Sequence, residues 1–353
     1  MSQERITTTD REAMAFIARF PGADTEAVAQ ALIANPSRFD SDDKERSIHP
    51  TENVVSRRLA KLARLGCVQS WRSPAALVTH HGILEGGMDA LELFGQAPGL
   101  ERGISQKRGL ALMHGRDISN VAAQLMYGEY ADPRVTALIG SSVPVDSFIT
   151  DQAMHSALAT LRKQDTAFTL YQHVQQTLAQ THSEELADPA FWHSNPELLV
   201  FTGSAGLDTK HRTHRPDLVV FTEKGHRIAF EVERSAKSVA SYIDTLRLFR
   251  ATLLGYATAD KRKAQPVNGL IWLCTSDTIK NAVTRAANMV DPNLIKEGWV
   301  IVTDLTRANG DPLTYGEAAP PKPRTATRPE TVTASTRPPK LSTSHTATSA
   351  PVA

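Results

Sequence analysis

The chain has 353 residues, with 39 Lys and Arg against 38 Asp and Glu and 41% hydrophobic residues, so it is long enough for two domains and is not uniformly basic. No segment approaches the roughly 18 uninterrupted apolar residues of a membrane helix, and MSQERITTTDRE at the N-terminus lacks the apolar core of a signal peptide. We therefore expect a soluble, cytoplasmic protein. The two cysteines, Cys67 and Cys274, fall in different predicted domains, which argues against a disulfide framework and against a Cys-based zinc site.

Two short helices are predicted at the N-terminus, because apolar residues recur there at spacings of three and four. The first covers residues 10–19, with Asp10 as its N-cap and Pro21-Gly22 as its stop. The second covers residues 25–33 and is capped by Asp24 or Thr25.

A third predicted helix runs from Thr51 to Gly66 and separates apolar from basic residues. Its apolar face carries Val55, Leu59, Leu62 and Leu65, and its basic face carries Arg57, Arg58, Lys61 and Arg64. Between residues 51 and 72 five basic residues stand against the single acid Glu52, which gives this window a formal charge of +4.

Beyond Gly66 the alternation of residues 67–71, a turn at Ser73-Pro74 and the run of residues 76–79 predict a β-hairpin. The order helix, helix, basic helix, hairpin is that of a winged helix-turn-helix, which we expect over residues 1–82. A narrow helix with a cationic front fits the major groove, so Arg57, Arg58, Lys61 and Arg64 are predicted to bind double-stranded DNA. Two alternatives are a basic face that only keeps the helix soluble and a winged helix that docks a protein.

Residues 83–199 read as a mostly helical connector, with helices over residues 116–127 and 151–181. The histidines of this region and its border, His80, His81 and His114, are assigned no chemistry, because an isolated His is usually a hydrogen-bonded structural residue.

Residues 200–310 predict a small mixed sheet flanked by helices. The runs HRPDLVVF and RIAFEVERS form a hairpin, followed by a helix over residues 238–256, strands over residues 269–274 and 299–305, and a helix between them over residues 278–289. The fold class expected for the whole chain is therefore α+β.

The predicted hairpin gathers three carboxylates. Glu231 and Glu233 share one side of a strand about 7 Å apart, and Asp217 opens the partner strand. Such acids repel one another unless a cation compensates, and Mg²⁺ would be the natural one. The predicted chemistry is metal-dependent DNA cleavage, in which Asp217 and Glu231 hold the metal, Glu233 is a third ligand or a water-activating base, and Lys237 stabilises phosphate charge. We expect Arg215 and Arg234 to contact the DNA backbone. The alternatives are a hairpin whose polar face merely meets solvent and a nuclease fold kept only for binding.

The same segment resembles the PD-(D/E)xK nuclease superfamily. Pro216-Asp217 matches the first part of its motif and Glu231-Val232-Glu233 the second, with Glu233 standing where that superfamily usually has lysine. Lys237, four residues later, would supply the missing positive charge.

The chain as a whole resembles the replication-relaxation family of plasmids, phages and other mobile genetic elements, over roughly residues 10 to 305. The resemblance is carried by LVTHHG ending the winged helix, Met113-His114 followed by DISNV, His214-Arg215-Pro216-Asp217, and EVERSAKS from Glu231. It implies a DNA-binding role in replication or maintenance of such an element, with a homodimer or the element's replication proteins as possible partners. The competing interpretation is a non-catalytic transcriptional regulator or replication accessory factor. The chain has neither the His-x-His pair of a relaxase nor a G-x-x-x-x-G-K-[ST] phosphate loop.

Residues 311–353 are predicted to form a disordered tail. From residue 317 onward Pro, Thr, Ala and Ser dominate and there is no Phe, Tyr, Trp, Ile or Met, so this stretch offers too little apolar surface to offset the entropy of ordering.

Overall fold

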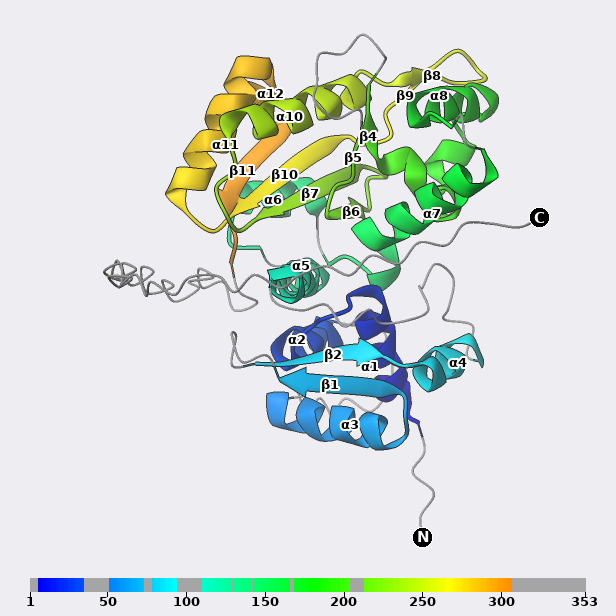
Figure 1. Cartoon of the computed structure of the whole chain (residues 1–353), viewed down its shortest axis with the longest axis vertical. Coiled ribbons are helices and arrows are strands. Elements are labelled where there is room, and N and C mark those ends of the chain that lie inside the picture. The colour runs from blue at the N-terminus through cyan, green and yellow to red at the C-terminus, as the bar shows by residue number, and fades with distance from the viewer. Residues whose placement is uncertain are drawn as a thin grey trace, which may run out of the picture. The chain divides into compact units, whose positions relative to one another are not determined.

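The structure is a computed structural model that describes residues 6–34, 51–72, 78–93, 110–128, 130–140, 142–165, 168–203 and 213–306. Within these ranges the chain has a mixed α+β fold, as expected from the sequence (Figure 1). The predicted tail, residues 311–353, lies outside the described residues. No helix of the described part is both long and apolar enough to cross a membrane.

The N-terminal region consists of α1 (Thr8–Arg19), α2 (Thr25–Ala34), α3 (Glu52–Arg64), β1 (Val68–Arg72) and β2 (Thr79–Ile83), so the predicted order of three helices and a hairpin is confirmed. The two strands are antiparallel, with Val68 paired to Ile83 and Arg72 to Thr79. Val55, Leu59 and Leu62 of α3 are buried as expected. The predicted turn at Ser73-Pro74 lies outside the described residues.

Two details of this region differ from the prediction. The N-cap of α1 is Thr7, and Asp10 stands at the third helical position, where its carboxylate accepts the Thr7 backbone N–H in a capping box. Leu65 is the C-cap of α3 and is 37% exposed, so it does not belong to the buried apolar face that the sequence predicts.

The middle region is mostly helical, with α4 (Glu85–Leu93), α5 (Leu110–Tyr127), α6 (Pro133–Ile139), α7 (Asp151–Gln164), α8 (Leu170–Gln180) and α9 (Pro189–Ser194). The stretch predicted to be helical over residues 151–181 contains two helices, since α7 ends before the extended residue Asp165 and α8 begins after Thr169. The region also contains a strand that was not predicted from the sequence, β3 (Phe148–Thr150).

A five-stranded sheet dominates the C-terminal region, in the order β11-β10-β7-β6-β3. The antiparallel hairpin β6 (Leu218–Phe221) and β7 (Arg227–Glu233) lies at its centre. β10 (Gly269–Cys274) and β11 (Val300–Asp304) continue it in parallel on one side, and β3 pairs with β6 in antiparallel fashion on the other. The predicted hairpin and both later strands are thus confirmed.

One face of the sheet is covered by α10 (Val239–Leu253) and α11 (Asp277–Val290), which lie side by side, with α12 (Asn293–Lys296) following them (Figure 1). The core beneath them includes Val219, Ala229, Leu270 and Trp272, which are buried together with Tyr242 and Phe249 of α10. Short two-stranded pairs, β4 (Phe201–Thr202) with β5 (Thr213–His214) and β8 (Tyr256–Ala257) with β9 (Lys263–Ala264), flank this core.

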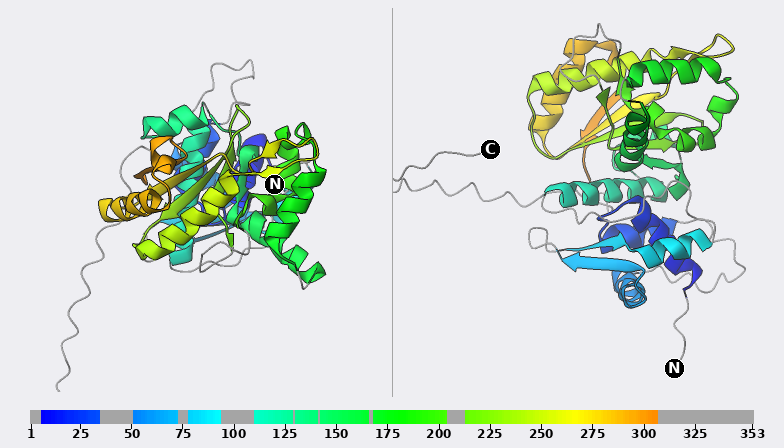
Figure 2. Two further views of the ribbon diagram at one scale, coloured as in Figure 1. Left: turned by 90° about the horizontal axis from the view of Figure 1, so that it is seen from above. Right: turned by 45° about the vertical axis from the view of Figure 1, so that its right-hand side comes forward.

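Helix α5 packs against α2 and also contacts β7. Figure 2 shows it as the teal helix between the blue N-terminal helices and the sheet. Its buried side chains include the polar residues Arg116, Asp117, Ser119, Asn120 and Gln124.

Candidate functional site

The β6–β7 hairpin brings Asp217 and Glu231 to neighbouring positions. The backbone N–H of Asp217 donates to the Phe230 carbonyl at 3.0 Å, and the N–H of Val232 donates to Oδ2 of Asp217 at 2.7 Å. Because Leu218 pairs with Phe230, Asp217 stands across from Glu231. The Glu231 side chain is 7% exposed and that of Asp217 is 18% exposed, so this carboxylate pair is largely shielded from bulk water.

Two histidines contact the carboxylate pair. Nε2 of His114 on α5 lies 2.8 Å from Oδ1 of Asp217, and Nε2 of His214 on β5 lies 2.7 Å from Oε1 of Glu231. The two imidazoles are about one third exposed, at 34% and 29%, whereas the carboxylates behind them are more deeply buried. The imidazoles are therefore the part of the site that solvent or a ligand meets first.

Protonation at this site is set by burial and by the paired charges. Burial works against protonation of both imidazoles, but the Asp217 carboxylate raises the pKa of His114, and the Glu231 carboxylate raises the pKa of His214. Burial also disfavours the charged form of Glu231, which raises the pKa of this carboxyl. Titratable groups with displaced pKa values gather more often at functional sites than elsewhere.

Glu233 and Lys237 form an ion pair next to this cluster. Nζ of Lys237 lies 2.7 Å from Oε2 of Glu233, whose side chain is 5% exposed, while the Lys237 side chain is 53% exposed. Burial works to lower the pKa of Lys237, but the hydrogen bond to Glu233 and the negative charges of Glu233, Glu231 and Asp217 together outweigh burial and raise it. Lys237 therefore neutralises the acid that occupies the usual lysine position of the sequence motif.

The two arginines expected at the DNA backbone have carboxylate partners in the fold. Nε of Arg234 lies 3.3 Å from Oδ2 of the buried Asp117. Nε of Arg215 donates to Oδ1 of Asp151 at 2.7 Å, and Arg215 also contacts His155. Arg215 remains one third exposed, so it is the more accessible of the two to a ligand.

Asp217 and Glu231 are suitable ligands for Mg²⁺. In proteins this ion usually binds one or two carboxylates, and water and substrate oxygens complete its coordination shell. Oε2 of Glu231 accepts no hydrogen bond from a described residue. No group of three or more His, Cys, Asp or Glu side chains in the described ranges is arranged to hold a metal ion. A cation at Asp217 and Glu231 would thus depend on water and substrate for the rest of its ligands.

The basic residues of α3 fall into two groups. Arg57 and Arg64 are exposed, on the same outward side as Asn53, Ser56 and Ala60. Arg58 and Lys61 instead turn toward α1, where Oδ1 and Oδ2 of Asp10 accept from them at 3.2 and 2.8 Å. Asp10 is fully buried. The four residues predicted as one DNA-binding set therefore include two that also hold α1 and α3 together.

His80 and His81, which were assigned no chemistry, both have hydrogen-bond partners inside the N-terminal region. Both are buried, and His81 bridges Thr25 and Ser70 with hydrogen bonds of 2.9 Å from its two ring nitrogens. Burial lowers the pKa of His81 to about 4. His114 received the same structural interpretation, yet it contacts Asp217. His214 belongs to the His-Arg-Pro-Asp run, and its position three residues before Asp217 was the available signal for it.

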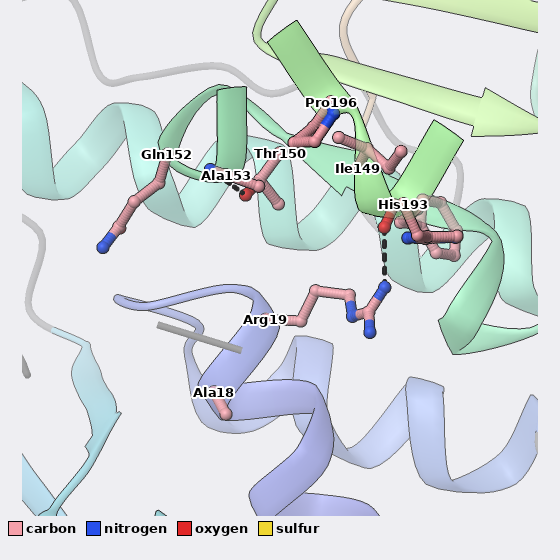
Figure 3. A pocket seen from close by; sticks show the side chains of 9 residues that line it. Ala18, Arg19, Ile149, Thr150, Gln152, Ala153, His193 and Pro196 are labelled. Carbon is pink, nitrogen blue, oxygen red and sulfur yellow. Dashed lines mark hydrogen bonds between the residues drawn. The ribbon is translucent and has the colours of Figure 1, made fainter. Parts of the chain in front are cut away.

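Two hollows in the surface have linings that include neither Asp217 nor Glu231. The smaller lies between Arg19 of α1 and the segment around Phe148, whose carbonyl accepts from Arg19 at 2.7 Å (Figure 3). The larger, of about 210 Å³, is lined mainly by Ala15, Phe16, Leu32, Met126 and Val143. Neither lining includes a residue predicted to carry chemistry.

Comparisons with models of protein families, with curated proteins and with solved structures find no match for this chain.

Proposed function

We propose that this chain is a DNA-binding protein of a mobile genetic element, active in the element's replication or maintenance, with a nuclease-like domain that cleaves phosphodiester bonds. The observation that carries the proposal is the meeting of Asp217 and Glu231 at the end of the β6–β7 hairpin, behind two partly exposed imidazoles. The role in a mobile genetic element is supported by the sequence resemblance to the replication-relaxation family.

In this proposal α1, α2, α3 and the β1–β2 hairpin act as a winged helix. The three helices bury a common apolar interior, and α3 presents Arg57 and Arg64 outward. Exposed arginines on a surface helix suit phosphate and major-groove contacts.

The nuclease-like domain is the five-stranded sheet with its helices. Asp217 and Glu231 would hold Mg²⁺, which when bound polarises a phosphodiester and generates hydroxide at neutral pH. The imidazoles of His114 and His214 keep the two carboxylates oriented, and Lys237 offsets the charge of Glu233. If Lys237 is to stabilise phosphate charge, it has to leave Glu233, which its exposed side chain permits.

The test is nicking of supercoiled plasmid with Mg²⁺ or Mn²⁺ by the full chain. We expect Asp217→Asn and Glu231→Gln each to abolish nicking while DNA binding persists. Glu197→Gln is the matched control, because Glu197 is also a buried acid, 3.1 Å from His173, but lies outside the site. Nicking that survives both site substitutions, or that Glu197→Gln removes equally, would refute the catalytic assignment.

A second candidate function is a non-catalytic regulator or replication accessory factor. It is favoured by the ion pairing of the site, where Asp217, Glu231 and Glu233 each already have a basic partner from the same chain. This candidate predicts DNA binding with no metal-dependent nicking by the wild-type protein.

A further inference from the structure

Helix α5 carries two consecutive buried ionisable residues, Arg116 and Asp117, whose partners come from different parts of the chain. Nε of Arg116 donates to Oδ2 of Asp24 at 2.5 Å, and Oδ2 of Asp117 lies 3.3 Å from Nε of Arg234. Asp24 belongs to the N-terminal region, whereas Arg234 directly follows β7. One turn of α5 thus contacts both the N-terminal region and the segment that follows β7.

Asp24, the partner of Arg116, also contacts elements of the proposed winged helix. Oδ1 of Asp24 accepts from the backbone N–H of Ala27 in the first turn of α2, and Asp24 forms a β-bridge with His80 of β2. α2 in turn packs on α3. A displacement of α3 and the hairpin therefore reaches Asp24 through direct contacts.

Arg234, the partner of Asp117, lies close in sequence to the carboxylate pair. Arg234 follows Glu233 at the end of β7, and His114, less than one turn before Asp117 on α5, contacts Asp217. α5 therefore contacts the site directly through His114, and it contacts the residue that follows Glu233 through Asp117.

The contacts of α5 leave little freedom to shift. Asp24, Arg116 and Asp117 are 2%, 8% and 0% exposed, and a buried ion pair such as that of Arg116 with Asp24 is costly to separate. Gly115 lies so close to the turn after α1 that a Cβ atom there would stand 2.9 Å from the Pro21 carbonyl oxygen. Such close packing passes displacements on instead of absorbing them.

We propose that Arg116 and Asp117 are positioning residues that set the DNA held at α3 in register with the Asp217–Glu231 pair. This inference rests on the proposed function and adds a link between its two sites. DNA bound at α3 alters the β7 end through α5, and the alteration requires the Asp24–Arg116 contact.

The test is hydrogen exchange of the 353-residue chain, measured by mass spectrometry with and without a random-sequence DNA duplex. In the wild type we expect the duplex to slow exchange in α3 and also in residues 228–237. In Arg116→Met the slowing in α3 remains and that in residues 228–237 is lost. Arg116→Lys, which keeps the charge, restores part of it.

Nicking gives a second readout. We expect Arg116→Met to lower the turnover of bound DNA by up to about 100-fold, as small misplacements of reacting groups do, while DNA affinity is unchanged. Arg250→Met is the control, since Arg250 forms a partly exposed ion pair with Asp291 away from α5. If Arg116→Met fails to fold, Asp24→Asn replaces it, because Asn keeps the cap of α2 while removing the charge that Arg116 meets.

The outcomes separate the two claims. A wild-type protein that binds no DNA refutes the proposed function and this inference with it. DNA binding that leaves the exchange of residues 228–237 unchanged refutes the inference alone. A response in Arg116→Met or Asp24→Asn equal to that of the wild type also refutes it, since the contact would then have only a structural role.

Discussion

His114 and Asp217 are 103 positions apart in the chain, and their side chains meet at 2.8 Å. The contact joins α5 to the residue directly before strand β6. Oδ2 of Asp217 is held by the backbone N–H of Val232, so His114 and the backbone together fix both oxygens of the carboxylate.

Replacement of His114 tests how much the hydrogen bond to Asp217 contributes to the nicking rate. We expect His114→Ala to lower the rate of plasmid nicking about 10- to 100-fold, the usual effect of losing a residue that orients a metal-binding group. His114→Gln should retain more activity, because its amide can donate to Oδ1. Steady-state kinetics at saturating DNA measure the difference. Equal losses in the two variants would contradict an orienting hydrogen bond.

The division of the α3 arginines gives a prediction about salt dependence. Substituting both Arg57 and Arg64 with Gln should reduce the slope of log affinity against log salt by about 2, since each exposed cation at a phosphate contributes about one unit. Arg250→Gln serves as the charge-matched control for one substitution. DNA titrations over a range of salt concentrations test this, and an unchanged slope would place the DNA on another surface.

Asp10 should oppose DNA binding while it supports the fold. Burial tends to raise the pKa of Asp10, but its hydrogen bonds with Lys61 and Thr7 outweigh burial and lower it. Asp10→Asn removes the charge that faces Arg58 and Lys61, so we expect it to reduce the free energy of unfolding by about 1–3 kcal/mol. It should also strengthen DNA binding at low salt. Urea denaturation and DNA titration measure the two effects, and a variant that loses stability without gaining affinity would show that these cations do not reach DNA.

His81 should make the N-terminal region sensitive to acid. Its pKa is about 4 in the fold against 6.5 for an unperturbed imidazole, so the unfolded chain binds the proton more readily. The stabilisation is complete above pH 6.5 and is lost as the pH falls toward 4, by roughly 3 kcal/mol in total. Urea denaturation at pH 7 and pH 5 measures it.

The control for this prediction is His81→Gln, which cannot titrate. Its stability at pH 7 will be lower than that of the wild type, but it should change less between pH 7 and pH 5. Asp117 has the opposite effect on the pH dependence of stability, because burial raises its pKa to about 7. The wild type and His81→Gln share this contribution, so it cancels when their pH dependences are compared. An identical pH dependence in both would contradict the assignment to His81.

Much of the secondary structure follows from local pattern. Strand β10 spans the predicted residues 269–274, and α11 differs from its predicted span by one residue at each end. These elements are long, strongly apolar on one or both sides and bounded by clear capping residues. The acids of the β6–β7 hairpin could also be assigned from alternation along the strand.

The rest depends on contacts between distant parts of the chain. β3 has only three residues, too few for a period of two to be recognised, and its pairing with β6 is decided by the fold. The partners of Asp10, Asp217 and Arg234 come from other elements, so spacing along the sequence carries no signal for them. Amphipathic spacing could identify the basic face of α3 but not show that Lys61 reaches back to a buried acid.

Strand β3 also constrains how this molecule can be divided. It covers the side of β6 that would otherwise present unpaired backbone groups, and it comes from a stretch that precedes the hairpin by more than sixty residues. An excised fragment beginning at residue 200 would leave that edge open to pairing with other chains. A fragment that is to contain every strand of this sheet therefore has to begin no later than Phe148.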